Sequence, residues 1–441
     1  MFANLLYILA LGALSPFILY RVLRHGRYRR GLSQKLFGLS VAQARALTGG
    51  KPCVWLHAVS VGEVNLLPGV VGKLQPRCNA PIVISTSTDT GYDLAVKHFG
   101  RDRVFFCPLD FSWAVRRTLR HLTPKQLILA ELELWPNLVR LATQANCPVA
   151  IINGRLSDRS SNGYQRFRRW TEPVFQSLQW IGCQDEVCQT NFAACGTPPE
   201  RLSVTGSLKF DDAPTDRATD EVQARKHWAR MAASHQVWIV GSTQEGEEQM
   251  ALDTYQSVRA KYPALRLILV PRHKERFDAV AALVRQSGFQ VKRRSETQVA
   301  CDSTWDARTV ILIDTIGELR HWWGVSQIAT VGGSFGDRGG QNMLEPAGYG
   351  SAVSFGPNTR NFKEIANRLL EAGGAVRVAD EAELRAFLER CLDDPSYIAM
   401  LGDAAQRVVN QHRGATDHTV DALGELLPQD VRKPERPRRA A

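Results

Sequence analysis

The sequence lacks the residue spacings of a metal site or of a disulfide framework. Its nine cysteines are scattered over 441 residues without a CxxC pair, and no histidine ladder stands at zinc spacing. These absences exclude a zinc module and indicate reduced thiols in a cytosolic setting, where most cysteines act as small apolar core residues. We therefore predict that the protein has no metal site and needs no metal cofactor.

Signatures of several nucleotide-dependent enzymes are missing as well. No GxGxxG and no GxxxxGK[ST] links a predicted strand to a predicted helix, which disfavours hydride transfer and P-loop hydrolysis. There is also no basic-aromatic platform of the kind that binds nucleic acid. The 55 Lys and Arg residues nevertheless exceed the 44 Asp and Glu residues, for a formal net charge of +11. This surplus indicates an anionic partner, which the charge alone does not identify.

Charged side chains are absent from residues 2–20, an apolar stretch that just reaches the length of a membrane-spanning helix. Five arginines follow it: Arg21, Arg24, Arg27, Arg29 and Arg30. Positive charge after the apolar segment argues against a cleaved signal peptide and places the rest of the chain in the cytoplasm. We predict a membrane anchor with a basic flank over residues 1–30. Because Pro16 interrupts the run, a helix in the bilayer interface is the main alternative, and a buried N-terminal helix is another.

Beyond residue 50, short apolar runs alternate with amphipathic stretches such as 63–74 and 135–144, a pattern typical of parallel sheets covered by helices on both faces. A first series of predicted strands covers residues 54–57, 82–85, 104–106, 127–130 and 149–152. A second series covers residues 237–240, 267–270, 310–313, 328–331 and 352–355. The polar stretch 209–220 between the series has little periodicity and is typical of a linker.

The alternation predicts an α/β fold with two Rossmann-like, doubly wound domains that face a cleft. We place the first domain at residues 31–208 and the second at residues 209–425. Residues 426–441 form a basic tail that we expect to be disordered, and its charges either contact anionic lipid or are simply solvated. In doubly wound sheets ligands bind beyond the carboxyl ends of the strands, so the loops there are the candidate sites.

Three strand ends in the second domain carry residues suited to a nucleotide. Arg272 follows the strand 267–270, where a guanidinium can bind phosphate or carboxylate or can remain a surface residue. At the second strand end, after residues 310–313, Gly317 permits a tight turn, and Glu318 is either a ligand contact or a first-turn helix carboxylate. The third strand end, after residues 328–331, carries VGGSF followed by GGQNMLEP, which contain two glycine pairs. Asn342 is a good helix N-cap there, and Glu345 can accept hydrogen bonds from a ribose.

Charged residues also follow strands of the first domain. Glu63 ends the HAVSVGE segment at a predicted helix N-terminus, where a carboxylate acts as a general base or only stabilises the helix; the helix dipole is expected to lower its pKa. Glu131 begins ELELWPN, and Lys209 lies in GSLKFD near the domain junction. These two charges form a structural ion pair or flank a reacting centre, and the sequence leaves both alternatives open.

Together these motifs resemble one family. The motifs that carry the resemblance are, in order, HAVSVGE, ELELWPN, GSLKFD, GSTQEGEE, LVPRHKERF, the GEL turn, VGGSF and GGQNMLEP. Through them the chain resembles the 3-deoxy-D-manno-octulosonic acid (Kdo) transferases of lipopolysaccharide synthesis, which have the GT-B glycosyltransferase fold. The resemblance extends over nearly the whole chain. It implies inverting transfer of Kdo from CMP-Kdo to the lipid A precursor, lipid IVA, at the cytoplasmic face of the inner membrane.

The resemblance also implies roles for individual residues. Glu63 would be the general base for the acceptor hydroxyl, and Glu131 and Lys209 would stabilise the transition state. CMP would be bound by nine residues of the second domain: Pro271, Arg272, Ile316, Gly317, Glu318, Asn342, Met343, Leu344 and Glu345. The implied partners are CMP-Kdo, the lipid A precursor and anionic inner-membrane lipid, with no nucleic acid.

Other functions remain as alternatives. A UDP-sugar epimerase or a transferase like lipid A disaccharide synthase shares the predicted fold, but the HAVSVGE and ELELWPN pair argues against both. A membrane-tethered module that binds CMP without turnover would have no need of Glu63. The number of Kdo residues added and the preferred precursor are left open.

Overall fold

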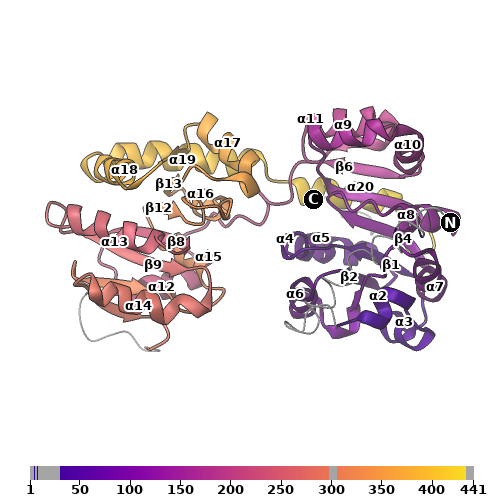
Figure 1. Ribbon diagram of the computed structural model, residues 1–441, viewed down its shortest axis with the longest axis horizontal. Coiled ribbons are helices and arrows are strands. Elements are labelled where there is room, and N and C mark those ends of the chain that lie inside the picture. Colours follow the sequence, from indigo (N-terminus) through magenta and orange to yellow (C-terminus); the bar gives the residue numbers. More distant parts are fainter. Residues whose placement is uncertain (1–3, 5–6, 8–29, 297–304, 434–441) are drawn as a thin grey trace, which may run out of the picture. The chain divides into compact units, whose positions relative to one another are not determined.

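The computed structural model describes Asn4, Tyr7 and residues 30–296 and 305–433, and it divides the chain into two compact units (Figure 1). The first unit comprises Met1–Asp212 and Arg413–Ala441, and the second comprises Ala213–His412. The chain therefore passes from one unit to the other twice.

Parallel strands form the sheet of the first unit. Within the described residues it has seven strands in the order β3-β2-β1-β4-β5-β6-β7. Their bounds are β1 Cys53–His57, β2 Ile82–Thr86, β3 Val104–Phe106, β4 Pro124–Ala130, β5 Val149–Gly154, β6 Trp180–Cys183 and β7 Leu202–Val204. All five predicted strands are present. The sequence pattern missed β6 and β7, which are short and lie toward one edge of the sheet.

Helices cover both faces of this sheet. They are α2 Leu32–Phe37, α3 Val41–Thr48, α4 Val61–Val64, α5 Leu67–Leu74, α6 Asp89–Phe99, α7 Ser112–Leu122, α8 Pro136–Gln144, α9 Asp158–Arg166, α10 Arg168–Gln176, α11 Glu186–Ala194 and α20 Ala415–Leu426. The predicted helix 135–144 corresponds to α8. The predicted helix 63–74 is instead two helices, α4 and α5, and Pro68 lies in the first turn of α5, where its missing N–H costs no hydrogen bond.

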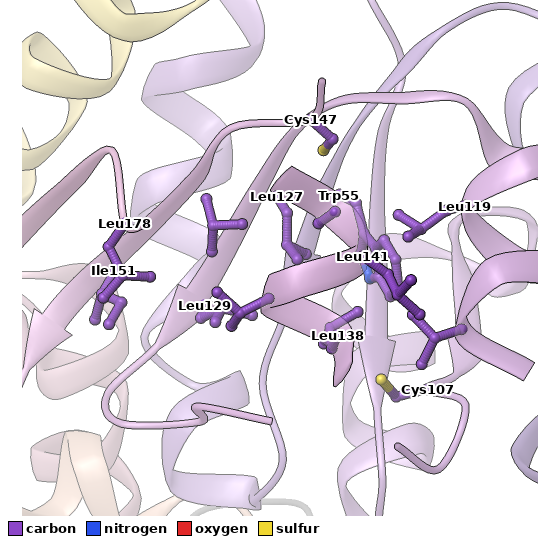
Figure 2. Close-up of a cluster of buried hydrophobic side chains, with 14 of the residues drawn as sticks. Trp55, Cys107, Leu119, Leu127, Leu129, Leu138, Leu141, Cys147, Ile151 and Leu178 are labelled. Atoms are coloured by element: carbon purple, nitrogen blue, oxygen red, sulfur yellow. The ribbon is translucent and has the colours of Figure 1, made fainter. Parts of the chain in front are cut away.

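Two apolar clusters lie on the opposite faces of the first sheet, which is why its central strands are apolar throughout rather than alternating. Figure 2 shows part of one cluster, in which Leu127 and Leu129 of β4 lie among Trp55 of β1 and Leu138 and Leu141 of α8. Cysteines contribute to both clusters, and the eight cysteines in the described part of the chain are buried and free, as predicted. Cys301 lies outside the described residues.

The second unit repeats the architecture. Its parallel sheet, again of seven strands in the part that the structure describes, has the order β10-β11-β9-β8-β12-β13-β14. The strands are β8 Gln236–Thr243, β9 Leu265–Pro271, β10 Gln290–Arg293, β11 Thr309–Leu312, β12 Ile328–Val331, β13 Ala352–Phe355 and β14 Ala375–Arg377. The helices are α12 Asp220–Ala229, α13 Glu247–Val258, α14 Phe277–Gln286, α15 Leu319–Trp322, α16 Leu344–Gly348, α17 Lys363–Glu371, α18 Glu381–Asp393 and α19 Pro395–Gln411. The five predicted strands are present, and the short edge strands β10 and β14 were missed.

The end of the chain differs from the sequence-based division. Helix α20, which the sequence pattern assigned to the second domain, packs against α5 of the first unit. The Asp211 carboxylate accepts hydrogen bonds from the backbone N–H groups of Gly414 and Thr416 and so fixes the start of α20. The prediction of a disordered tail is wrong for residues 426–433: Leu426 ends α20, Leu427 and Val431 are buried, and Arg432 pairs with Cys78 in a β-bridge. Residues 434–441 lie outside the described part.

The prediction of a membrane anchor falls mostly outside the described residues. In the ranges that are described, no helix has both the length and the apolar character to cross a membrane. Two residues of the N-terminal run are described: Tyr7 donates a hydrogen bond to Asp110, and Asn4 donates one to Ser112. Arg30, the last arginine of the basic flank, forms a bidentate ion pair with Asp93 of α6.

Candidate active site

The candidate catalytic residues lie where the strand order of the first sheet reverses. Strand β1 has β2 on one side and β4 on the other, so the loops after β1 and β4 open next to each other at the carboxyl edge. Glu63 follows β1, and Glu131 follows β4 directly. Such a reversal is the place where doubly wound sheets bind ligands.

The Glu63 carboxylate is 7% exposed and holds the start of α4. One oxygen, Oε1, accepts hydrogen bonds from the Ser60 backbone N–H and hydroxyl at 3.2 and 2.6 Å. The other, Oε2, accepts one from the backbone N–H of Val59 at 2.8 Å. In return, the Ser60 hydroxyl accepts a hydrogen bond from the Glu63 backbone N–H, which completes a capping box. The helix-stabilising role that the sequence left open is therefore present.

The pKa of Glu63 is raised above its ordinary value, whereas the helix dipole alone predicted a lowered one. Burial is the main cause, since it penalises the charged carboxylate, and the negative charge of Glu131 adds to it. The hydrogen bonds from Ser60 and Val59 oppose the shift without cancelling it. The helix-dipole prediction fails because α4 spans only four residues and the carboxylate is buried.

Glu131 and Lys209 form an ion pair, with 3.2 Å between Glu131 Oε1 and Lys209 Nζ. About a quarter of each side chain is exposed, 26% for Glu131 and 27% for Lys209. The buried side chain of Asn153, at the end of β5, links the two segments. Its Nδ2 lies 3.5 Å from Glu131 Oε1, and its Oδ1 accepts a hydrogen bond from the Leu208 backbone N–H. The sequence left open whether Glu131 and Lys209 form an ion pair or flank a reacting centre, and the structure shows the ion pair directly.

Backbone strain marks the same place. Glu131 has a φ of 57° and Asn153 a φ of 55°, both in the left-handed region, at the ends of the neighbouring strands β4 and β5. Asn tolerates this conformation, but a glutamate there costs about 1–3 kcal/mol, which the surrounding fold must outweigh. The sequence analysis did not identify Asn153. Its place directly after the predicted strand 149–152 is the feature that could have marked it as a site residue.

Glu133 was also missed, although it belongs to the same ELELWPN segment. Its Oε2 accepts a hydrogen bond from the indole N–H of Trp135 at 3.1 Å. Burial, together with the negative charges of Glu63 and Glu131, raises the pKa of Glu133 to about 7. Three carboxylates at this edge therefore repel one another, and Lys209 pairs with only one of them by a direct contact.

His57 closes the carboxyl end of β1 and is fully enclosed. Its Nδ1 lies 2.8 Å from the Ser85 hydroxyl, while its Nε2 has no hydrogen-bond partner among the described residues. Burial lowers the pKa of His57 to about 4, so the ring is neutral at pH 7. It is a core side chain beneath the site rather than a proton donor at its surface.

The corresponding edge of the second sheet uses its carboxylates differently. Glu247 is 4% exposed, and its oxygens accept hydrogen bonds from four backbone N–H groups: those of Gln244, Gly333, Ser334 and Phe335. Glu248 is fully buried and makes a bidentate ion pair with Arg276 at 2.6 and 2.8 Å. Both residues lie in GSTQEGEE, whose structural role the sequence analysis did not identify. They fix the VGGSF loop and the turn after β9.

The predicted donor-binding residues lie at the ends of β9, β11 and β12, but not all of them present side chains. Arg272 is exposed, and 78% of Ile316 is exposed next to Gly317, which has a φ of 88°. Met343 and Leu344 are buried, at 0% and 1% exposure, so only their backbone remains for a ligand. Pro271 is likewise buried, as the last residue of β9.

Two predicted acidic residues are held by neighbours in the same unit. Glu318 accepts hydrogen bonds from Arg294 and the Trp322 indole. Burial acts to raise the pKa of Glu318, but these bonds outweigh it and hold the pKa below its usual range. Glu345 lies 3.4 Å from the side-chain amide of Asn342, whose oxygen accepts a hydrogen bond from the Leu344 backbone N–H. The N-cap residue of α16 is Met343, which has no capping side-chain hydrogen bond, so the prediction of Asn342 as the N-cap is wrong by one residue, although the Asn342 side chain still contacts the first turn.

A polar cavity of about 550 Å³ opens at the ends of β8, β9 and β12. Its lining includes His273, Arg276 and Arg338 together with Glu245 and the backbone of Gly333. The predicted donor-binding residues flank this cavity in sequence but are not among its lining residues. Cationic groups at a sheet's carboxyl edge suit a phosphate or carboxylate ligand.

Known proteins with similar sequences identify the family. Residues 27–212 match the family described as 3-Deoxy-D-manno-octulosonic-acid transferase (kdotransferase). A 3-deoxy-D-manno-octulosonic acid transferase of Haemophilus influenzae is 35% identical over 410 residues, which cover 92% of this chain and 93% of the relative. The chain belongs to the Kdo transferase family. A second Kdo transferase, from Bordetella pertussis, is 32% identical over 433 residues, 96% of this chain and 99% of its own.

The fold of this Kdo transferase family member is shared more widely. A UDP-GlcNAc 2-epimerase from Neisseria meningitidis, solved with UDP-GlcNAc, superposes with a TM-score of 0.57 at 11% identity and covers 85% of this chain and 100% of its own. A likeness at that identity concerns the fold alone. It supports the predicted two-domain α/β architecture of the GT-B type, while the family follows from the sequence relatives.

Proposed function

We propose that the protein is an inverting glycosyltransferase that moves Kdo from CMP-Kdo to lipid IVA, the lipid A precursor, in lipopolysaccharide biosynthesis. Membership in the Kdo transferase family supports Kdo transfer. The observation that carries the proposed mechanism is the buried carboxylate of Glu63 at the reversal of the first sheet, electrostatically coupled to Glu131 and its partner Lys209.

Glu63 is the proposed general base. A carboxylate has about four lone-pair positions, and hydrogen bonds from Val59 and Ser60 occupy two on Oε1 and one on Oε2. The remaining position on Oε2 can accept the proton of an acceptor hydroxyl. The same hydrogen bonds hold the carboxylate in one orientation, and burial raises its pKa toward the working pH, which favours general-base catalysis.

In the proposed reaction the acceptor oxygen attacks the anomeric carbon of Kdo while Glu63 takes the hydroxyl proton. The bond between that carbon and the phosphate oxygen breaks, and CMP leaves with the electron pair. Lys209, held by Glu131, supplies positive charge near the reacting groups. The proposed CMP contacts lie in the second unit and require no metal. They are Arg272 and Glu318, the backbones of Pro271, Ile316 and Gly317, and the segment from Asn342 through Met343 and Leu344 to Glu345.

The proposal extends to location. Residues 1–30 carry the uncharged run and the arginine cluster, and they are the proposed anchor at the inner membrane, with both units on the cytoplasmic side. Anionic lipid phosphate is the proposed partner of the arginines outside the described residues. No nucleic-acid partner is proposed.

Incubation of the full chain with CMP-Kdo and lipid IVA, followed by mass spectrometry of the lipid, tests the function. The expected product is lipid IVA heavier by one or more Kdo residues, with CMP released in equal amount. UDP-GlcNAc in place of CMP-Kdo is the control donor and should give neither transfer nor epimerisation. Epimerisation of UDP-GlcNAc without Kdo transfer would support the epimerase alternative and contradict the proposal.

A further inference from the structure

A large apolar cavity lies in the first unit, apart from the charged groups described above. It measures about 980 Å³, at the upper end of the roughly 300–1,000 Å³ typical of ligand pockets. Helices α8, α9 and α10 form its walls, and α10 packs against both of the others (Figure 1). The mechanism proposed for Kdo transfer leaves this cavity without a role.

The lining of the cavity is suited to hydrocarbon. Leu134, Pro136, Tyr164, Val174 and Phe175 contribute to it, and Arg140 is the only charged residue among the described residues that line it. At its mouth, two large apolar side chains are exposed: Phe167, between α9 and α10, at 61%, and Trp170, in the first turn of α10, at 63%. Exposed aromatic groups beside an open apolar cavity mark a binding surface rather than an ordinary solvated face.

Basic side chains surround this mouth. Arg159 and Arg166 of α9 and Arg169 of α10 are exposed, while Arg168 forms an i,i+4 ion pair with Glu172. Aromatic residues flanked by arginines are characteristic of elements that lie at a membrane interface, where arginines meet lipid phosphates and aromatic rings enter the acyl boundary. The charge pattern therefore favours a phosphate-bearing lipid over a neutral apolar partner.

The cavity adjoins both the candidate active site and the N-terminal run. Leu134 lies in the same loop as Glu131 and Glu133, and Pro136 begins α8 directly after it. Burial raises the pKa of Tyr164 in the cavity wall, and the charges of Cys195 and Glu133 add to the shift. Tyr7, from the uncharged N-terminal run, also lines the cavity, with its hydroxyl bonded to Asp110. A ligand in the cavity thus contacts the N-terminal run at Tyr7 and lies next to the loop proposed to hold the reacting groups.

We propose that this cavity binds an acyl chain of the lipid acceptor, with Phe167, Trp170 and the exposed arginines at the membrane surface. The identity of the lipid as the acceptor rests on the proposed function, whereas the binding of an acyl chain rests on the cavity itself. Seating a chain here would bring the acceptor's sugar toward the loop after β4. The chain's own N-terminal run and an apolar helix of another protein are the competing occupants.

Gly163 of α9 allows the cavity to be filled without disturbing its walls. It lines the cavity, and a Cβ added there would meet no atom within 4 Å. Gly163→Phe should occupy the cavity, while Gly163→Ala makes the same backbone change without filling it. Gly72→Phe on α5 is a second control, because Gly72 is an exposed helical glycine with equally open surroundings outside the cavity. Matching thermal unfolding curves would show that all three variants fold.

Fluorescence titration with a dansyl-labelled undecanoic acid measures the binding directly. Wild type, Gly163→Ala and Gly72→Phe should bind the probe alike, and Gly163→Phe should bind it about tenfold more weakly, as expected when several methylene contacts are lost. Equal binding by Gly163→Phe and wild type would overturn the proposal. So would failure of the wild type to bind the probe, because the cavity would then be closed by the N-terminal run or another occupant.

Transfer assays test the link to the acceptor. Gly163→Phe should raise KM for lipid IVA about tenfold, with kcat unchanged and no effect on a fully deacylated, bisphosphorylated disaccharide acceptor. An equal effect on both acceptors would overturn the acyl-chain role. If the wild type transferred no Kdo at all, the proposed function would fail, but the fluorescence titration would still decide whether the cavity holds an acyl chain.

Discussion

The two units share an architecture but use their buried carboxylates in opposite ways. At the reversal of the first sheet, burial raises the pKa values of Glu63 and Glu133. The charge of Glu131 adds to both shifts, and the charge of Glu63 adds to that of Glu133. At the corresponding edge of the second sheet, Glu247 is bound by four backbone N–H groups and Glu248 by Arg276.

The difference separates proton chemistry from anion binding. Burial raises the pKa of Glu63 and Glu133 in the first unit and also that of Glu247 in the second. Among the described residues, three hydrogen bonds occupy the Glu63 carboxylate and four occupy that of Glu247, so only Glu63 keeps a lone-pair position for a proton. In the second unit Glu247 and Glu248 fix loops, and the polar cavity beside them is lined by Arg276, Arg338 and His273 as well as by Glu245 and Asp337. Under the proposed function, the first sheet supplies the general base and the second binds the phosphate-bearing donor.

Glu63→Gln should have the largest effect, because it removes the proposed base. The remaining amide oxygen can still accept the hydrogen bonds from Ser60, but the bond from the Val59 N–H is lost. We expect kcat to fall by about 10²–10⁴-fold, the usual contribution of a general base. CMP affinity, measured by titration calorimetry, should change less than about twofold because the donor contacts lie in the second unit. A variant with near wild-type turnover would show that the base lies elsewhere.

Lys209→Met should lower kcat by about 10²-fold, since the positive charge is lost and Glu131 is left without its ion-pair partner. Lys209→Arg, which keeps the charge, should recover part of the loss. Steady-state kinetics on both variants, with their urea unfolding midpoints, separate catalysis from stability. Equal losses of kcat in the two variants would contradict a role for the charge.

Glu247→Gln should destabilise the second unit by about 2 kcal/mol, because the amide cannot accept four backbone hydrogen bonds and directs N–H groups at other donors. CMP affinity should fall with it as the loop loosens. Glu245→Gln, at an exposed residue lining the same cavity, is the matched control and should change the unfolding free energy by less than about 0.5 kcal/mol. Similar unfolding curves for the two variants would show that Glu247 does not fix the loop.

Glu133→Gln should give the smallest effect, and one that depends on pH. The folded state holds the Glu133 proton more tightly than the unfolded state, so the free energy of unfolding falls as the pH rises from about 4.5 to about 7. Removing the charge should therefore stabilise the protein by about 1 kcal/mol at pH 8, after allowing for partial exposure, and by almost nothing at pH 4. Urea unfolding at both pH values measures this, with exposed Glu186→Gln as control. A pH-independent difference would place the Glu133 pKa near its ordinary value.

The sequence predicted ten of the strands, among them every strand next to the reversal of either sheet, because parallel strands buried on both faces are apolar throughout. It missed β6, β7, β10 and β14, which are short and lie toward sheet edges. Glu63 and Glu131 were found from their places after strands, Lys209 from its place near the domain junction, and all three from the family resemblance. The contacts of Glu247 could not be found in this way, because it bonds to Gly333, 86 residues away in the chain. The raised pKa of Glu63 likewise depends on burial by tertiary packing, and local helix reasoning gave the wrong sign.

The pH dependence of kcat/KM in wild type and Glu63→Gln tests the central claim most directly. Wild-type kcat/KM should fall toward low pH with unit slope, through a pKa above the ordinary 4.5 of glutamate, as the Glu63 carboxylate takes up a proton and can no longer act as a base. The residual activity of Glu63→Gln should lack this acidic limb. A wild-type profile that is flat between pH 5 and 8, or the same limb persisting in Glu63→Gln, would contradict the assignment of proton transfer to the first unit.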